Sequence, residues 1–255
     1  MQKSTVFITG ASSGIGYATA FAFAKEGADL LLCARRIDRL EELKAQLHAQ
    51  YPDIDIHIFQ LDVRDQKAVH QSLSTLPEEW RMIDILVNNA GLSRGLDKLH
   101  EGSLQDWEEM IDTNVKGLLY VTQEIVPGMV TRGSGHIINI GSIAGHEVYP
   151  KGNVYCASKF AVDAITKGLR MDLVDTPIRV TSIDPGLVET EFSSVRFHGD
   201  EEKAAQVYRT IKALTAEDIA DAIVWVASRP AHVQIAEMII FPTAQASAAV
   251  VHRTA

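Results

Sequence analysis

The stretch Thr9-Gly10-Ala11-Ser12-Ser13-Gly14-Ile15-Gly16 decides the fold. It follows an apolar run at 5–9 and precedes a segment rich in alanine and phenylalanine at 15–26. Gly27 comes directly after that segment, in the position that glycine often takes just past the end of a helix. Because glycine adopts backbone angles that other residues avoid, it allows a tight turn between two elements. We therefore predict a strand, a glycine-rich turn and a helix in succession.

The rest of the chain repeats this alternation of strand and helix. The apolar runs are continuous, as in strands that are covered on both faces of a parallel sheet. We predict strands at 5–9, 29–33, 55–60, 84–87, 136–140, 179–183 and 237–241, and helices at 15–26, 36–50, 103–132, 154–174 and 215–227. This order predicts an α/β protein with a single doubly wound, Rossmann-like domain over 1–255, in which helices cover both faces of a seven-stranded parallel sheet. The less regular segment 191–212 is interpreted as an inserted loop with a short helix, near the carboxyl ends of the strands where such folds bind ligands.

Composition narrows the classes of partner and compartment. The 255 residues contain 24 Lys and Arg against 33 Asp and Glu, which gives a formal net charge of −9. This balance argues against a nucleic acid or an anionic membrane as partner, since both reward clustered basic residues. Cys33 and Cys156 offer no disulfide framework, and the N-terminus lacks the apolar stretch of a signal peptide. We expect a cytoplasmic protein with no membrane span and with a small-molecule substrate.

The glycines of the first turn are spaced for binding an anion. Gly10, Gly14 and Gly16 follow the pattern G-x-x-x-G-x-G at the start of a predicted helix. The free N–H groups and the dipole of a helix N-terminus favour a phosphate, and glycine lets the backbone approach it closely. The nine histidines show no spacing typical of a metal site, so no metal is expected.

Five motifs, in order, make the chain resemble the short-chain dehydrogenase/reductase family. They are the stretch 9–16, Asn88-Asn89-Ala90-Gly91, Asn114 with Ser142, Tyr155-x-x-x-Lys159, and Asp184-Pro185-Gly186-x-Val188-x-Thr190. The resemblance implies a nicotinamide cofactor held by Gly10, Ser12, Ser13, Gly14, Ile15, Gly16, Asn89, Ala90, Gly91, Tyr155, Lys159, Pro185, Gly186, Val188 and Thr190. It also implies a homotetramer that pairs long helices near 103–132 and 154–174.

The catalytic residues implied by the resemblance make chemical sense together. Tyr155 and Lys159 stand four residues apart, on one face of a helix. An adjacent ammonium is expected to lower the pKa of the phenol, so that Tyr155 exchanges a proton with the substrate oxygen. Ser142 is expected to bind the same oxygen. Asn114 lies inside the helix predicted at 103–132, where the family has a kink that holds a water leading to Lys159, so the resemblance implies a proton relay to solvent through Asn114.

The end of the second predicted strand suggests which nicotinamide cofactor binds. An acid there binds the ribose 2′-hydroxyl of NAD, whereas an arginine accommodates the 2′-phosphate of NADP. Here the strand runs into Arg35 and Arg36, so we predict NADP, with Arg35 on the phosphate and Arg36 assisting or stacking on the adenine. The chain departs from the family in one position: Ser13 stands where many NADP users carry a second basic residue, and its hydroxyl or that of Ser12 is expected to bond the phosphate weakly. By resemblance, Asp62 and Val63 contact the adenine.

Further strings suggest a class of substrate. Residues 76–80, 110–114, 135–142 and 191–197 are similar to NADP-dependent 3-hydroxy acid dehydrogenases, a group that includes serine and allo-threonine dehydrogenases and malonic semialdehyde reductases. The resemblance implies hydride transfer between NADP(H) and a small 3-hydroxy acid or 3-oxo acid. Two alternatives remain open: a reductase of an uncharged ketone or aldehyde, and a non-catalytic nucleotide-binding sensor.

A 3-hydroxy acid brings a carboxylate that needs a partner once the site closes over it. The cationic candidates are Arg94, His146, Lys151 and Arg196. We predict Arg196, since it lies in the 191–197 string and a guanidinium suits two-point recognition of a carboxylate. The tail after Phe241 is expected to pack at a subunit contact.

Overall fold

A computed structural model describes residues 4–254 and confirms the doubly wound, single-domain α/β fold. The seven strands form one sheet in the order β3-β2-β1-β4-β5-β6-β7, and every neighbouring pair is parallel. The strands are β1 (Thr5–Thr9), β2 (Asp29–Ala34), β3 (Ile56–Gln60), β4 (Ile85–Asn88), β5 (His136–Ile140), β6 (Arg179–Pro185) and β7 (Glu237–Ile240). All seven predicted strands are present, with ends that differ by at most two residues.

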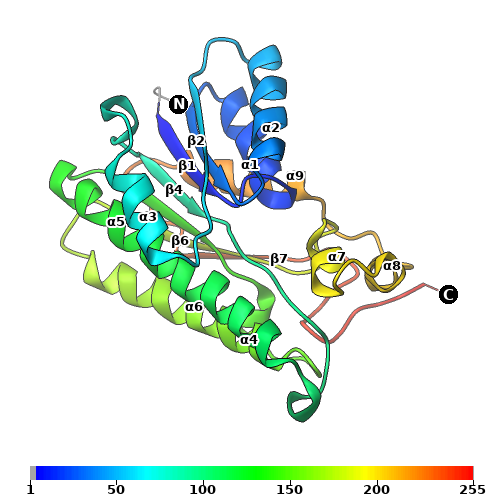
Figure 1. Cartoon of the computed structure of the whole chain (residues 1–255). Coiled ribbons are helices and arrows are strands. Elements are labelled where there is room, and N and C mark those ends of the chain that lie inside the picture. The colour runs from blue at the N-terminus through cyan, green and yellow to red at the C-terminus, as the bar shows by residue number, and fades with distance from the viewer. Residues whose placement is uncertain (1–3, 255) are drawn as a thin grey trace.

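Helices cover both faces of this sheet (Figure 1). One face carries α1 (Gly14–Lys25), α2 (Ile37–Gln50) and α9 (Ala216–Ala227), and the other carries α3 (Gln66–Ser74), α5 (Leu118–Arg132) and α6 (Asn153–Asp172). Each face has its own apolar core, with Phe23, Leu43 and Ile219 in one and Val69 and Val121 in the other. No helix in the described part of the chain is long and apolar enough to cross a membrane.

The helix predicted at 103–132 is interrupted. It consists of α4 (Leu104–Ile111), a π-helical stretch η3 (Asp112–Gly117) and α5. Asn114 lies in the π-helical stretch, which widens the helix where the sequence predicted a kink. Pro127 lies inside α5, so the interruption is not at the proline.

Three smaller differences separate the structure from the prediction. The helix α3 was not predicted, because its apolar stripe within nine residues comprises Val69 and Leu73. The short 3-10 helices η1 (Glu78–Trp80), η2 (Leu99–Glu101) and η4 (Ile143–Gly145) were not predicted either. The segment 191–212 holds two short helices rather than one, α7 (Phe192–Arg196) and α8 (Glu201–Tyr208). Both lie beside the end of the tail, at one end of the molecule (Figure 1).

Candidate active site

The carboxyl ends of the central strands open into one elongated cavity of about 660 Å³. Its wall comes from the loops after β1 to β6, together with α7, α8 and the tail. This is the place where a doubly wound sheet binds its ligand, because neighbouring loops diverge there. Every residue of the predicted cofactor-binding set lines this cavity except Gly16.

The glycine turn shows the geometry expected of a phosphate cradle. Gly10 and Gly14 have φ angles of +66° and +55°, which residues with a side chain rarely adopt. Gly16 is needed for packing instead, since a Cβ there would lie 2.4 Å from Nδ2 of Asn89. The N-cap Ser13 makes no side-chain bond to the first turn of α1, and that turn holds no acidic residue. The N–H groups of this helix end therefore suit an anionic group such as a pyrophosphate.

Basic side chains surround the adenosine end of the cavity. The Arg36 guanidinium donates to Oγ of Ser13 at 2.9 Å and to Oγ of Ser12 at 3.3 Å. Arg35 is exposed on the cavity wall, and its guanidinium makes no hydrogen bond or ion pair with a described residue. These groups fit a cofactor that carries a 2′-phosphate.

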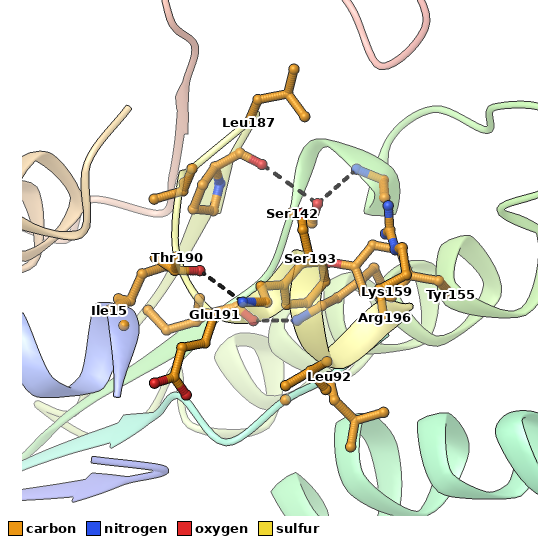
Figure 2. A pocket seen from close by; sticks show the side chains of 18 of the residues that line it. Ile15, Leu92, Ser142, Tyr155, Lys159, Leu187, Thr190, Glu191, Ser193 and Arg196 are labelled. Carbon is orange, nitrogen blue, oxygen red and sulfur yellow. Dashed lines mark hydrogen bonds between the residues drawn. The ribbon is translucent and has the colours of Figure 1, made fainter. Parts of the chain in front are cut away.

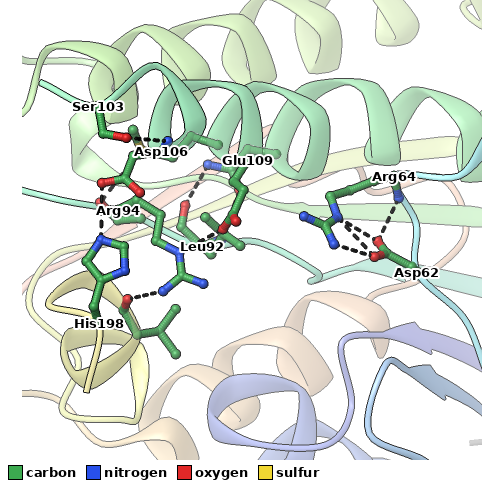
Figure 3. Close-up of polar contacts among 12 residues, drawn as sticks. Asp62, Arg64, Leu92, Arg94, Ser103, Asp106, Glu109 and His198 are labelled. Atoms are coloured by element: carbon green, nitrogen blue, oxygen red, sulfur yellow. Dashed lines mark hydrogen bonds and ion pairs between the residues drawn. The ribbon is translucent and has the colours of Figure 1, made fainter.

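Asp62 lines the cavity next to Val63 but is engaged by a residue that the sequence analysis did not single out. The Arg64 guanidinium pairs with the Asp62 carboxylate, with Nη2 at 2.6 Å from Oδ2 (Figure 3). Burial alone would raise the pKa of Asp62, but hydrogen bonds from Arg64 outweigh it and the pKa is lowered. Asp62 is therefore ionised and able to accept a hydrogen bond.

Tyr155 and Lys159 project from α6 into the middle of the cavity (Figure 2). Burial raises the pKa of the Tyr155 phenol, and Tyr149, which repels the phenolate when itself ionised, adds to this, whereas Arg196 and a hydrogen bond with Ser142 oppose it. Burial lowers the pKa of Lys159 to about 8, against the opposing charge of Asp184. Lys159 donates from Nζ to the carbonyl of Ile140 at 2.8 Å.

The expected lowering of the Tyr155 pKa by Lys159 does not arise from the protein alone. Nζ of Lys159 lies 6.0 Å from the centre of the Tyr155 ring and is bonded to a backbone carbonyl. The cation that lowers this pKa is Arg196, whose guanidinium carbon lies 5.3 Å from the same ring centre. Burial outweighs the charge of Arg196, so the Tyr155 pKa in the protein alone is raised.

Ser142 follows β5 and lies on the cavity wall beside Tyr155. Its Oγ accepts from the amide of Ala144 at 3.1 Å and so caps η4. The same serine therefore caps this short helix and lines the cavity. The backbone amide of Ser142 donates to the buried Asp184 carboxylate at 3.2 Å, and this bond holds the backbone at Ser142 in place. The serine hydroxyl is thus held where it can bind a substrate oxygen near the phenol.

Asn114 lies behind the cavity wall and does not line it. Its Oδ1 accepts from the amide of Leu92 and its Nδ2 donates to the carbonyl of Leu92, both at 2.8 Å. Nδ2 also donates to Oγ of Ser158 at 3.0 Å, and Ser158 in turn donates to the carbonyl of Tyr155. The asparagine therefore joins the loop after β4 to the helix that carries Tyr155.

Of the four candidate partners for a carboxylate, Arg196 alone lines the main cavity. It donates from Nε to Oγ of Ser93 and from Nη2 to Oη of Tyr149, both at 2.9 Å, and lies over the ring of Phe192. Arg94 instead pairs with Glu109 at 2.9 Å and donates to the carbonyl of Val195 (Figure 3). With Lys151 it lines a separate cavity of about 20 Å³.

His146, the fourth candidate, faces two carboxylates rather than the cavity. Its Nε2 lies 3.4 Å from Asp184 and 3.2 Å from Glu237. These ligand atoms lie within 4.8 Å of one another, close enough to hold a metal ion, although the sequence spacing gave no sign of it. The carboxylates also engage His146 as an ion pair when it is protonated, so it is not available to a substrate.

The tail and two tyrosines complete the cavity and were missed by sequence reasoning. Tyr149, Tyr208, Ala248 and Arg253 all line it. Arg253 donates to the carbonyls of Arg209 and Val207, which attaches the tail to the end of α8. The tail was expected at a subunit contact, yet within the chain it forms part of the site wall. The signal in the sequence that could have indicated Tyr149 was its position just before Pro150 and Gly152.

Comparison with known proteins agrees with this geometry. The family described as short chain dehydrogenase matches residues 4–201. The chain belongs to this family. A protein of Salmonella typhi named NADP-dependent 3-hydroxy acid dehydrogenase YdfG is 49% identical over 251 residues, which cover 98% of this chain and 99% of that protein. A Schizosaccharomyces pombe protein named NADP-dependent 3-hydroxy acid dehydrogenase is 45% identical, with 99% and 98% covered.

Solved structures of this short-chain dehydrogenase family share the fold throughout. The closed form of serine dehydrogenase complexed with NADP+ matches with a TM-score of 0.92 at 48% identity, covering 98% of this chain and all of that chain. A serine dehydrogenase from Escherichia coli matches with a TM-score of 0.82 at 44% identity, covering 95% and 99%. The present chain therefore shares the fold of these dehydrogenases over nearly its whole length.

Proposed function

We propose that the protein is an NADP-dependent oxidoreductase that transfers hydride between the nicotinamide and a small 3-hydroxy acid or the matching 3-oxo acid. One observation carries the substrate class: the Arg196 guanidinium lies in the cavity 5.3 Å from the ring of Tyr155. A cation at this place binds a carboxylate while the hydroxyl of the same small molecule reaches the phenol. The relatives named for NADP and 3-hydroxy acids support the same proposal.

The chain's own residues perform the proton chemistry. NADP, when bound along the glycine turn and the Arg35–Arg36 end, supplies the hydride acceptor. Tyr155 takes the proton from the substrate hydroxyl in oxidation and returns it in reduction. Ser142 holds the same oxygen, and the positive charge of Lys159 stabilises the phenolate as it forms. Asn114 fixes the distance between the loop after β4 and α6.

The buried surroundings of Tyr155 matter for this step. Its side chain contacts Phe192 at 5.6 Å between ring centres and is almost fully covered. In such a place the attraction between charges is stronger than in water, so a carboxylate is held firmly by Arg196. The proposal also assigns the segment 191–212 as the substrate-binding insertion, since α7 and α8 both contribute to the cavity wall.

A matched panel of substrates tests the proposal. The purified protein is given NADP+ or NAD+ with 3-hydroxypropionate and with its uncharged methyl ester, and formation of the reduced cofactor is followed by absorbance. We expect kcat/KM with NADP+ to be at least about ten-fold higher for the acid, the factor that about 1.4 kcal/mol provides. Equal or better use of the ester favours a reductase of uncharged substrates. Binding of NADPH without turnover of any hydroxy compound favours a nucleotide sensor.

We further propose a cytoplasmic homotetramer. The two cysteines are buried and unpaired, which suits a reducing compartment. Leu119 on α5 and Phe160 on α6 are apolar yet about two-fifths exposed, on the two helices that the family resemblance pairs between subunits. Exposed apolar side chains on neighbouring helices support a subunit contact there.

A further inference from the structure

The helix α7, which carries Arg196, is hydrogen-bonded at its C-terminal end to the substrate side of the cavity. The carbonyl of Arg196 accepts from the amide of Gly95 at 2.9 Å, and the carbonyl of Val195 accepts from Arg94 at 2.6 Å. These bonds hold the C-terminal end of α7 against the loop after β4. The N-terminal end of α7, at Glu191, reaches in the other direction toward the cofactor end.

Glu191 binds two arginines, Arg36 at the N-cap of α2 and Arg39 within that helix, and of these two Arg36 lines the cavity. Its Oε2 lies 3.1 Å from Nη1 of Arg36, and its Oε1 pairs with Nη1 of Arg39. The same Arg36 guanidinium donates to Ser12 and Ser13 in the glycine turn. One carboxylate thus connects α7 to the two elements expected to hold the 2′-phosphate and the pyrophosphate.

A second contact at the same place brings the two walls together. A Cβ added to Gly14 would lie 3.3 Å from Cβ of Thr190, the residue before Glu191, so the glycine turn lies close to the chain that leads into α7. Burial would raise the pKa of Glu191, but hydrogen bonds from Arg39 and Arg36 outweigh it, so the carboxylate is ionised near neutral pH. The ion pairs are therefore formed under working conditions.

We propose that Glu191 is a positioning residue that clamps the start of α7 to Arg36 and Arg39, so that recognition at the cofactor's phosphate end fixes Arg196 at the substrate end. This inference rests on the proposed function for its substrate side. Glu191 and Arg196 lie at opposite ends of a five-residue helix, so a shift at one end moves the other. The ion pairs must also open when the cofactor leaves between the two walls.

Arg39 provides a clean variant, because it binds Glu191 but does not line the cavity. We compare Glu191→Gln, Arg39→Gln and the double variant with two matched controls. Glu189→Gln changes an exposed acid two residues before Glu191, and Lys44→Gln changes an exposed cation of α2. The readouts are KM and kcat for the acid and its methyl ester, and the rate of NADPH release measured by fluorescence.

The clamp predicts a specific pattern. Exposed ion pairs contribute modestly, so each single variant should release NADPH about two- to five-fold faster and raise KM for the acid by a similar factor. KM for the ester and kcat should change less than about two-fold, and the double variant should match the stronger single variant because the pair acts as a unit. The controls should resemble the wild type.

Three results would overturn the clamp. Tighter NADPH binding in Glu191→Gln would mean that Glu191 competes with the phosphate. Additive effects in the double variant, or variants that behave like the controls, would also contradict it. Failure of the proposed function is recognised separately. If the wild type turns over neither acid nor ester, the proposed substrate class is wrong, while the NADPH release rates still decide whether the clamp exists.

Discussion

Tyr155 lies among groups that push its pKa in opposite directions. Burial and Tyr149 raise it, whereas Arg196 and Ser142 lower it. Lys159, the residue expected to dominate, has its own pKa lowered to about 8 by burial, and its ammonium is bound to the carbonyl of Ile140. The pKa of the phenol therefore depends on more than the Tyr-x-x-x-Lys spacing, because the arginine on α7 lowers it as well.

Replacing Tyr155 by Phe keeps the ring and removes the proton-exchanging hydroxyl. General acid and base catalysis contributes about 10²–10⁴-fold, so we expect kcat to fall by at least the lower of these factors. NADPH binding, measured by fluorescence titration, should persist because the glycine turn and the arginines are untouched. Full turnover by the purified variant would remove Tyr155 from its assigned role.

Arg35 offers a direct test of cofactor choice. Its guanidinium makes no hydrogen bond or ion pair with the described residues, so it is available to a 2′-phosphate. A hydrogen bond to a charged group contributes about 1.5–3 kcal/mol, which is roughly ten- to hundred-fold in affinity. We expect Arg35→Ala to raise the dissociation constant for NADPH by that factor and to leave NADH nearly unchanged. Equal losses for the two cofactors would show that Arg35 does not bind the phosphate.

At the scale of elements, β5 begins with a buried histidine. His136 lies against Oγ1 of Thr181 on β6, with Nε2 at 2.8 Å. Burial, together with the positive charge of Arg179, lowers its pKa from 6.5 to about 3. The imidazole is therefore neutral in the folded protein, while the unfolded chain takes up a proton below about pH 6.5.

This difference makes stability fall as the pH falls. Between pH 6.5 and about 3 the unfolded state binds more protons at His136, so the free energy of unfolding decreases by about 1.4 kcal/mol per pH unit from this group. We expect His136→Gln to reduce the loss between pH 6.5 and 5, measured by urea denaturation. The control His48→Gln, on an exposed position of α2, should keep the wild-type dependence. An unchanged dependence in His136→Gln would contradict the buried neutral histidine.

The strands were predictable from sequence because each is a continuous apolar run between polar loops. Irregular features were not. The π-helical stretch around Asn114 depends on the two bonds between its amide and Leu92, which is distant in sequence. The group of His146, Asp184 and Glu237 exists because β6 and β7 are neighbours, which the sequence does not state. The tail's place in the site wall likewise depends on Arg253 reaching backbone carbonyls of α8 and the residue after it.

At the scale of the whole molecule, the exposed apolar residues of α5 and α6 bear on assembly. Leu119 and Phe160 are exposed in the single chain, and covering them would stabilise a complex. We expect sedimentation analysis to give four times the mass of one chain, and Phe160→Glu to give a smaller species, because a charge is costly at a buried contact. If the wild type and Phe160→Glu are both tetramers, the subunit contact does not involve Phe160. A monomeric wild type would contradict the proposed tetramer.

The whole cavity can be understood as one pocket with a cation at each end. Arg35 and Arg36 lie at the adenosine end, and Arg196 lies at the other end with Tyr155 and Ser142 between them. This arrangement suits two anionic molecules that meet at the phenol, one held by its phosphate and one by its carboxylate. The central claim is therefore that the carboxylate of the substrate is recognised by Arg196.

The most direct test compares the wild type with Arg196→Gln on a 3-hydroxy acid and on its methyl ester. Both substrates present the same hydroxyl to Tyr155 and differ in the charge that Arg196 is proposed to bind. If the account is right, the variant raises KM for the acid about ten- to hundred-fold, the loss of one charge-assisted interaction, and changes KM for the ester by less than about three-fold. An equal change in KM for both substrates, or no change for the acid, would contradict it.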